Sequence, residues 1–205
     1  MLVVCGPSGV GKTTLLDSLL AAEPDLHFAV SWTPRPAREG EVNGRDYHFV
    51  SPRQFAAEAA GGPGVLESAE VHGHHYGTPR REVVPYLLDG RVVVVDIDVQ
   101  GAAQVRASGL PAAFVMVLPP SLDELERRLR SRESETAETL ARRLAAAEAE
   151  IAHWPEFDFV IVNDDRARAA ADLRAVRQAA AHLVRAGLAP RGWREPPRDP
   201  EWTDD

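Results

Sequence analysis

The sequence predicts an α/β fold in which helices cover both faces of a parallel β-sheet. Unbroken apolar runs at residues 2–5, 92–95, 113–118 and 159–162 have the composition of strands that are buried on both faces. Stretches with helical periodicity lie between these runs, as the crossover connections of a parallel sheet require. The chain has 205 residues, of which 44% are hydrophobic and 26% charged, and this length indicates one core with insertions rather than two full domains.

The first predicted strand leads through a glycine-rich loop into a helix. Glycine occupies three of the six positions from residue 6 to residue 11. Over residues 13–22, leucines at positions 15, 16, 19 and 20 have the spacing of one buried helix face. We therefore expect a strand, a loop and a helix in this order.

The segment from residue 31 to residue 88 has a different texture. Prolines and glycines are frequent near its start, and its strand-like pieces at residues 47–50 and 65–71 are short. This pattern predicts a small mixed insertion on the sheet, with a helix over residues 52–60.

The second half of the chain adds two charged helices, which we expect over residues 121–132 and 136–151. The first follows two prolines and begins with a capping box, because Ser121 stands three residues before Glu124. Near the end of the chain, prolines alternate with charged residues and no apolar periodicity remains. We expect residues 186–205 to be a disordered tail.

Composition and charge exclude several classes of partner. The formal net charge of −8 and the pI near 5.4 oppose general binding to nucleic acid. No apolar run approaches the ~18 residues of a membrane span, and the first residues lack the basic segment of a secretion signal. Cys5 is the only cysteine, which fits a reducing compartment. We expect a cytoplasmic protein that binds neither nucleic acid nor a membrane.

The glycine-rich loop at residues 6–13, Gly-Pro-Ser-Gly-Val-Gly-Lys-Thr, matches the phosphate-binding pattern G-x-x-x-x-G-K-[ST]. In such a loop backbone N–H groups converge on a phosphate, Lys12 reaches the β- and γ-phosphates, and the Thr13 hydroxyl can ligate Mg²⁺. Lys12 is also the only lysine among the 23 basic residues. The alternative, a simple glycine turn between a strand and a helix, explains neither the match nor the single lysine.

Two carboxylates end the strongest apolar run. Asp96 and Asp98 follow residues 92–95, and the carboxyl ends of parallel strands face the crevice where ligands bind. These groups can hold water ligands of Mg²⁺ or accept a hydrogen bond from a substrate. The alternative is that they cap a helix or stand in a loop.

Further segments share their order and spacing with one family of enzymes. They are Ser31-Trp-Thr-Pro-Arg35-Pro-Ala-Arg38 with Asp46-Tyr47, Glu67 through Tyr76-Gly77-Thr78, Asp96-Ile-Asp98-Val-Gln100-Gly101, and Val-Asn163-Asp-Asp. From residue 2 to about residue 183 the chain resembles the guanylate kinases. The resemblance implies an enzyme that transfers the γ-phosphoryl of ATP to GMP, and also to dGMP, giving ADP and GDP with Mg²⁺ as cofactor.

The resemblance also implies a division of the chain. The fold would be that of a P-loop nucleoside-monophosphate kinase, with its core in residues 1–31 and 89–185. A GMP-binding insertion would occupy residues 32–88, and a lid would lie at about residues 130–140.

Individual roles follow from the resemblance. The catalytic residues would be Lys12, Arg132 and Arg143. ATP would be bound by Gly6, Pro7, Ser8, Gly9, Val10, Gly11, Lys12, Thr13, Thr14, Arg132 and Asn163, with Asn163 near the adenine. GMP would be bound by Ser31, Arg35, Arg38, Tyr47, Glu67, Tyr76, Gly77, Thr78, Asp96, Asp98, Gln100 and Arg143. Thr13, together with waters and in one alternative Asp96, would hold Mg²⁺.

The chemistry of these residues agrees with the implied roles. The guanidinium groups of Arg35 and Arg38 and the phenols of Tyr47 and Tyr76 suit the dianionic phosphate of GMP. The carboxylate of Glu67 can accept from guanine N1–H and N2–H₂, and adenine offers neither donor.

The chain departs from the family pattern near the GMP site and at a group of histidines, and its lid segment is more acidic than is typical of the family. Trp32 and Pro34 stand where the family has a small or hydroxyl residue and a second threonine, and we expect them to reshape the mouth of the GMP site. His72, His74 and His75 form a cluster, for which a position on the surface or pocket rim is favoured over a zinc site. Three imidazoles on a short hairpin lack a fourth ligand.

Two other functions remain open from the sequence. A related P-loop kinase acting on another phosphorylated sugar or nucleotide is compatible with Trp32 and Pro34, but Glu67 together with Thr78 argues against it. A guanylate-kinase-like interaction module would bind a partner without catalysis, yet it would have no need of Lys12. ATP consumption in the presence of GMP separates these readings. We expect ATP and GMP as small-molecule partners, and a monomer or homodimer.

Overall fold

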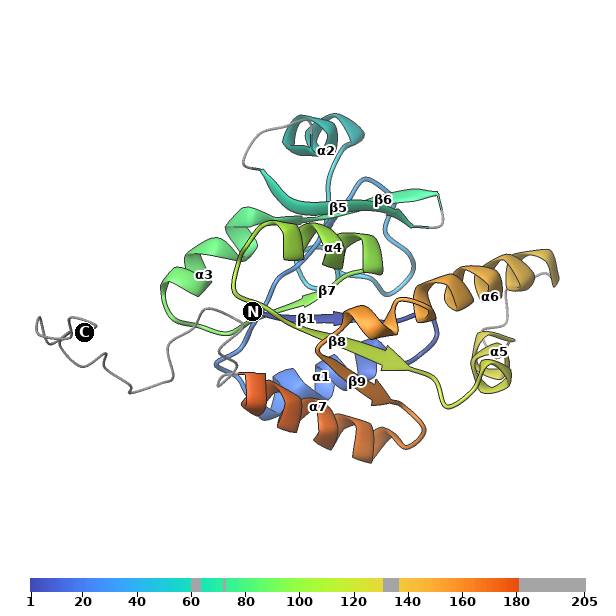
Figure 1. The fold of residues 1–205 in the computed structure, drawn as a ribbon. Helices are drawn as coiled ribbons and strands as arrows, with labels where there is room; N and C mark the ends of the chain where they lie inside the picture. The colour runs from blue at the N-terminus through green and yellow to red at the C-terminus, as the bar shows by residue number, and fades with distance from the viewer. Residues whose placement is uncertain (60–63, 72, 131–136, 181–205) are drawn as a thin grey trace, which may run out of the picture.

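The structure is a computed structural model that describes residues 1–59, 64–71, 73–130 and 137–180. The strands of this part of the chain form two sheets (Figure 1). Helices cover both faces of the larger sheet, whereas the smaller sheet is built from strands between residues 32 and 79. The predicted α/β architecture is therefore confirmed.

Five parallel strands form the central sheet, in the order β2-β7-β1-β8-β9. Their bounds are His27–Phe28 for β2, Val93–Asp96 for β7, Leu2–Cys5 for β1, Ala113–Leu118 for β8 and Phe159–Val162 for β9. The strand predicted at residues 92–95 is displaced by one residue. The edge strand β2 has only two residues, too few to show a period in the sequence.

Alternation along the central strands fills a core on each side of the sheet. Leu2 and Val4 pack with α1 and α7, whereas Val3 and Cys5 pack with α3 and α4. The two pairs of helices lie on opposite faces of the sheet (Figure 1). These helices are α1 (Lys12–Ala22), α3 (Val84–Leu88), α4 (Val99–Ala107) and α7 (Arg166–Ala180). Each fully buried Leu or Val contributes roughly 1.5–3 kcal/mol to the free energy of folding. The two cores therefore hold the central sheet rigidly, including the edge from which the glycine-rich loop emerges.

The second sheet has the order β4-β3-β6-β5 and mixes parallel with antiparallel pairs. Its strands are β3 (Trp32–Thr33), β4 (His48–Phe49), β5 (Val65–Val71) and β6 (His74–Pro79). The helix α2 (Pro52–Ala59) begins after Ser51, whose hydroxyl accepts the Gln54 N–H. Residue 60, the predicted end of this helix, lies outside the described residues.

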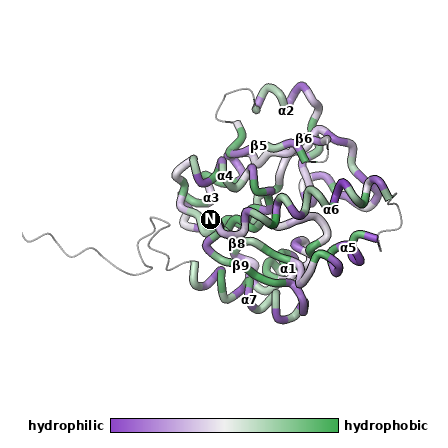
Figure 2. The backbone as a smooth tube through the Cα atoms, turned by 45° about the vertical axis from the view of Figure 1, so that its right-hand side comes forward, coloured by the Kyte–Doolittle hydropathy of each residue, from purple (hydrophilic) through white to green (hydrophobic). Residues whose placement is uncertain are grey.

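The charged helices α5 (Leu122–Arg130) and α6 (Ala137–Ile151) project beyond the carboxyl ends of the central strands (Figure 1). The Ser121 hydroxyl accepts the Glu124 N–H at 3.1 Å, as the capping box predicts, while the Glu124 carboxylate pairs with arginines of its own helix. The two helices share a small apolar cluster (Leu125, Leu129, Leu140, Ala147). Hydrophilic and hydrophobic residues alternate along both helices (Figure 2). Residues 131–136 between them lie outside the described part of the chain.

One carboxylate links the edge strands of the two sheets. Glu82, in the 3₁₀ turn η1 (Arg80–Glu82), lies 3.5 Å from His27 Nε2 of β2 and 3.4 Å from His48 Nε2 of β4. A second 3₁₀ turn, η2 (Trp154–Glu156), precedes β9.

Two further predictions concern membrane-spanning segments and the C-terminal tail. The helices of the described residues include none that is both long and apolar enough to cross a membrane. The predicted disordered tail, residues 186–205, lies outside the described residues.

Candidate active site

A cleft of about 720 Å³ lies between the glycine-rich loop, the second sheet and α6. Segments that the sequence analysis treated separately meet in its wall. The predicted residues that line it are Gly6, Pro7, Ser8, Gly9, Gly11, Lys12, Thr13, Thr14, Ser31, Arg38, Tyr47, Glu67, Tyr76, Asp96, Asp98 and Arg143.

The glycine-rich loop leaves β1 and opens α1, as its motif predicts. Gly11 caps α1 with a φ of 98°, a left-handed conformation that glycine adopts without strain. A Cβ on Gly11 would lie 2.6 Å from Asn163 Nδ2, so a side chain has no room there. Lys12 Nζ donates to the Gly6 carbonyl and lies 3.8 Å from Asp96 Oδ1. The loop therefore holds the ammonium group in the wall of the cleft.

The rear of the loop is fastened to the end of β9. Asn163 Nδ2 donates to the Val10 carbonyl at 2.7 Å, and Arg128 donates to the carbonyls of both Val10 and Asn163 at 3.3 and 2.9 Å. Val10 and Asn163 are both buried, and neither lines the cleft. Of these two predicted ATP-binding residues, Val10 therefore serves through its backbone inside the loop, and Asn163 supports the loop from behind.

One face of α6 lines the cleft and contacts the loop. Arg143 donates to the Ser8 hydroxyl at 2.7 Å. Thr139, Arg142 and Glu150 also line the cleft, and sequence analysis missed all three. The available signal was helical spacing, because Thr139 is four residues before Arg143 and Glu150 is seven after it. Burial raises the pKa of Glu150 to about 7, although the nearby Lys12 ammonium lowers it.

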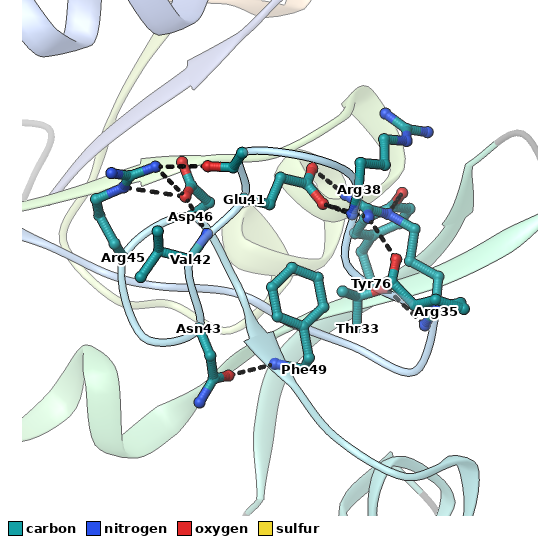
Figure 3. A network of polar contacts seen from close by, with 12 residues as sticks. Thr33, Arg35, Arg38, Glu41, Val42, Asn43, Arg45, Asp46, Phe49 and Tyr76 are labelled. Carbon is teal, nitrogen blue, oxygen red and sulfur yellow. Dashed lines mark hydrogen bonds and ion pairs between the residues drawn. The ribbon is translucent and has the colours of Figure 1, made fainter.

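At the second sheet, Arg35 pairs with Glu41 (Figure 3) and does not line the cleft. Arg35 Nη1 and Nη2 each donate to a carboxylate oxygen of Glu41 at 2.7 Å, and its Nε donates to the Tyr76 hydroxyl at 3.0 Å. The Arg35 side chain is only 3% exposed and lies behind the rings of Tyr47 and Tyr76, which do line the cleft. Hydrogen bonding from Arg35 lowers the pKa of Glu41 to about 2. Burial raises the pKa of Tyr47 to about 12.

The deepest carboxylate of the second sheet is Glu67, which is 4% exposed. It stands opposite Thr78 in the β5–β6 ladder, and Thr78 Oγ1 lies 3.4 Å from Ser31 Oγ. Burial, with a smaller contribution from the Asp98 charge, raises the pKa of Glu67 to about 7 against hydrogen bonds from Thr78 that lower it. Asp98 both lines the cleft and caps α4, since its Oδ1 accepts the Gly101 N–H at 2.8 Å.

Oxygen donors for a divalent cation gather beside Lys12. Thr13 and Asp96 both line the cleft. Burial raises the pKa of Asp96, and the Lys12 ammonium opposes this shift. A hydroxyl and a carboxylate suit Mg²⁺, which binds through one or two protein oxygens together with waters and phosphates. The described residues contain no group of three or more His, Cys, Asp or Glu side chains arranged for a metal ion.

Several predicted residues are not brought into the cleft wall. Gly77 and Thr78 are buried beside β5, and Gln100 is exposed, with its Nε2 donating to Asp98 Oδ2 at 3.0 Å. Arg35 is held back by Glu41, and Arg132 lies outside the described residues, as does His72.

The departures from the family pattern also lie away from the cleft wall. Trp32 is buried in β3 with the Arg81 guanidinium 4.4 Å from its ring, and neither Trp32 nor Pro34 lines the cleft. In the described residues, therefore, neither side chain reshapes the mouth of the cleft by touching it. His74 and His75 are exposed at the start of β6.

Comparisons with known proteins agree with this geometry. The sequence model of the family "Guanylate kinase" matches residues 1–180. This chain belongs to the guanylate kinase family.

Curated guanylate kinases resemble the chain over most of its length. It is 53% identical to that of Thermosynechococcus vestitus over 165 residues, covering 80% of this chain and 86% of that protein. It is 49% identical to that of Dechloromonas aromatica over 179 residues, covering 87% and 88%. The crystal structure of guanylate kinase from Anaplasma phagocytophilum is similar with a TM-score of 0.70 and 32% identity, covering 87% of this chain and 84% of that one.

Proposed function

We propose that the cleft binds ATP at the glycine-rich loop and GMP at the second sheet, so that the γ-phosphoryl passes between two nucleotides held in one cavity. As a guanylate kinase, the protein is an ATP:GMP phosphotransferase that forms ADP and GDP. The observation that carries the proposed arrangement is the single cleft that joins Lys12 to Glu67.

On the donor side, the loop from Gly6 to Thr14 wraps the phosphates of ATP with backbone N–H groups and the start of α1. Lys12 contributes a compact positive charge, which its bond to the Gly6 carbonyl holds in place. Thr13, with waters and Asp96, holds Mg²⁺, which when bound neutralises charge on the β- and γ-phosphates. Asn163 acts from behind the loop through the Val10 carbonyl.

On the acceptor side, Arg38, Tyr47 and Tyr76 receive the phosphate of GMP. Because the Tyr76 hydroxyl accepts from Arg35 Nε, its own proton is free to donate to a phosphate oxygen. Arg35 thus assists the acceptor phosphate through Tyr76.

Guanine is read by the Glu67 carboxylate, supported by Asp98, Ser31 and Thr78. A carboxylate that accepts N1–H and N2–H₂ in a buried pocket discriminates strongly, since a base lacking those donors leaves it unpaired. Gly77 and Gln100 support this pocket through β6 and Asp98 respectively.

Transfer itself needs positioning and positive charge rather than a covalent intermediate. Lys12 and Arg143 both line the cleft, where they stabilise charge on the moving phosphoryl. Arg132, from the lid at about residues 130–140, adds a further positive charge. The core comprises residues 1–31 and 89–185, and residues 32–88 form the GMP-binding insertion. The enzyme works in the cytoplasm as a monomer or homodimer and binds neither nucleic acid nor membranes.

A coupled ADP-release assay with GMP, dGMP, AMP, CMP and UMP as acceptors tests this proposal. We expect rapid release with GMP and dGMP and slow release with the other three. Equal rates with GMP and AMP would overturn the role of Glu67. Release that does not depend on any nucleoside monophosphate would overturn the shared-cleft arrangement.

A further inference from the structure

One amide side chain of α4 forms two hydrogen bonds with the backbone of β5. Gln104 Oε1 accepts the Ser68 N–H at 3.0 Å, and Gln104 Nε2 donates to the Ser68 carbonyl at 2.7 Å. Because β5 is an edge strand of the described second sheet, the amide takes the place that a further strand would occupy. Ser68 follows Glu67 directly, so this clamp fixes the backbone from which the Glu67 side chain projects.

One helical turn earlier, Gly101 provides the space that the Glu67 carboxylate occupies. A Cβ on Gly101 would lie 2.5 Å from Glu67 Oε2 and 3.3 Å from Asp98 Oδ1. The Gly101 N–H meanwhile donates to Asp98 Oδ1. The same helix face therefore anchors the strand at Gln104, makes room for one carboxylate at Gly101 and orients the other at Asp98.

We propose that Gln104 and Gly101 are positioning residues that set the acceptor-base specificity of the enzyme through Glu67. This inference rests on the proposed reading of guanine by Glu67 and adds that α4 decides where the carboxylate stands. Neither residue needs to touch GMP.

The physical requirement is the pairing of one carboxylate with two donors. Guanine presents N1–H and N2–H₂ side by side, so a tilted or displaced carboxylate keeps one hydrogen bond and loses the other. Inosine monophosphate (IMP) keeps N1–H and lacks the 2-amino group. The preference for GMP over IMP therefore reports the second hydrogen bond alone, while ribose and phosphate contacts stay the same.

Two variants move the carboxylate by different means. Gln104→Met keeps the length of the side chain but removes both bonds to Ser68. Gly101→Ala inserts a methyl group against Glu67 Oε2, and alanine favours a helix more than glycine does, so folding is retained. We expect each variant to raise the KM for GMP about tenfold or more and to lower the GMP-to-IMP preference to a similar degree. The kcat and the KM for ATP should stay within about twofold of wild type, because the loop and Lys12 are untouched.

A double-mutant cycle with Glu67→Gln separates positioning from a general structural role. If both residues act through the carboxylate, their effects on the GMP-to-IMP preference largely disappear once the carboxylate is gone. Gln178→Met, an exposed change on α7, is the matched control and should leave all constants unchanged.

The proposal is overturned if both variants keep the wild-type KM for GMP, or if their effects simply add to that of Glu67→Gln. It is also overturned if kcat and the KM for ATP change as much as the KM for GMP. A preference for GMP that survives in Glu67→Gln itself would instead show that Glu67 does not read guanine, which is a failure of the proposed function.

Discussion

Glu41 neutralises Arg35 through two parallel hydrogen bonds of 2.7 Å each. The guanidinium is nearly inaccessible to solvent, so the carboxylate compensates a charge that water cannot reach. Glu41 also accepts the Arg38 N–H and thereby shapes the loop that carries Arg38 to the cleft (Figure 3). The acceptor-phosphate site is consequently built on an ion pair that the motif pattern alone does not reveal.

Replacing Glu41 by alanine should destabilise the protein markedly. Breaking a buried ion pair leaves an uncompensated charge, which costs on the order of 3 kcal/mol. Urea denaturation measures the free energy of unfolding. Arg45→Ala is the matched control, because the Arg45–Asp46 pair lies in the same loop and is mostly exposed, so its loss should have little effect. Equal, small effects of both variants would show that the Arg35–Glu41 pair does not stabilise the fold.

Lys12→Ala should abolish most transfer while the fold persists. The ammonium supplies charge to the β- and γ-phosphates, and loss of one such group lowers kcat by about 10²–10³-fold. Lys12→Arg should fail as well, because a planar guanidinium does not replace a compact ammonium in a tight loop. Single-turnover ADP formation gives the rate, and circular dichroism checks folding. A folded alanine variant within a few-fold of the wild-type rate would remove Lys12 from catalysis.

Asn163→Asp should weaken the loop rather than change the choice of donor nucleotide. The substitution replaces the Nδ2–H donor by an oxygen that faces the Val10 carbonyl, and a buried unpaired group costs about 1–3 kcal/mol. We expect a lower free energy of unfolding and a raised KM for ATP and GTP alike. An ATP-to-GTP preference that changes while stability stays constant would show direct contact with adenine.

The central strands were predictable because their signal is local. Residues 2–5, 113–118 and 159–162 are continuous β-branched or apolar runs, and the structure reproduces their bounds. The short strands β2 and β3 were missed because two residues carry no periodicity.

In the candidate site, too, the contiguous motif was predictable and the contacts between distant segments were not. The glycine-rich loop is contiguous in sequence, and its motif located it. The pairing of Arg35 with Glu41 and the hydrogen bond from Asn163 to Val10 depend on tertiary packing, which no sequence spacing encodes. Glu150 shares a helix face with Arg143, so its spacing gave a signal that only the docking of α6 on the cleft makes meaningful.

The affinity for GMP should fall as the pH drops below 7. Burial raises the pKa of Glu67 to about 7, so at pH 6 only about a tenth of the free enzyme holds the carboxylate that accepts from guanine. The KM for GMP should therefore rise about tenfold at pH 6 relative to its value at pH 8. Initial rates at saturating ATP between pH 6 and pH 8 measure this profile.

The stability of the fold should depend on the ionisation of Glu67 with the opposite sign, falling as the pH rises. Because the folded pKa lies above the ordinary value of 4.5, the folded state binds more protons, and Glu67 lowers stability as pH rises from about 4.5 to 7. Glu67→Gln should remove this slope and raise the melting temperature at pH 8. Glu150→Gln distinguishes the effect of Glu67 from that of Glu150, another buried carboxyl with a raised pKa. This variant should alter the pH dependence of stability but leave the pH dependence of the KM for GMP unchanged.

Glu67→Gln should weaken the discrimination between guanine and adenine, although it stabilises the fold at pH 8. The amide keeps the shape of the side chain but presents an N–H₂ group to a guanine donor, and an unpaired buried polar group costs about 1–3 kcal/mol. The kcat/KM for GMP should therefore fall ten- to a hundredfold. Activity towards AMP should fall far less, since adenine offers neither donor.

The ratio of kcat/KM for GMP to that for AMP measures this effect and is insensitive to the fraction of active enzyme. Thr78→Val serves as the comparison, because it removes a hydroxyl beside Glu67 and leaves the carboxylate in place. A smaller loss of the ratio in Thr78→Val than in Glu67→Gln is expected, since Thr78 assists the carboxylate without replacing it. If Glu67→Gln instead lowers both acceptors equally, Glu67 is a structural residue, and Asp98, which lines the same cleft, becomes the group that reads guanine.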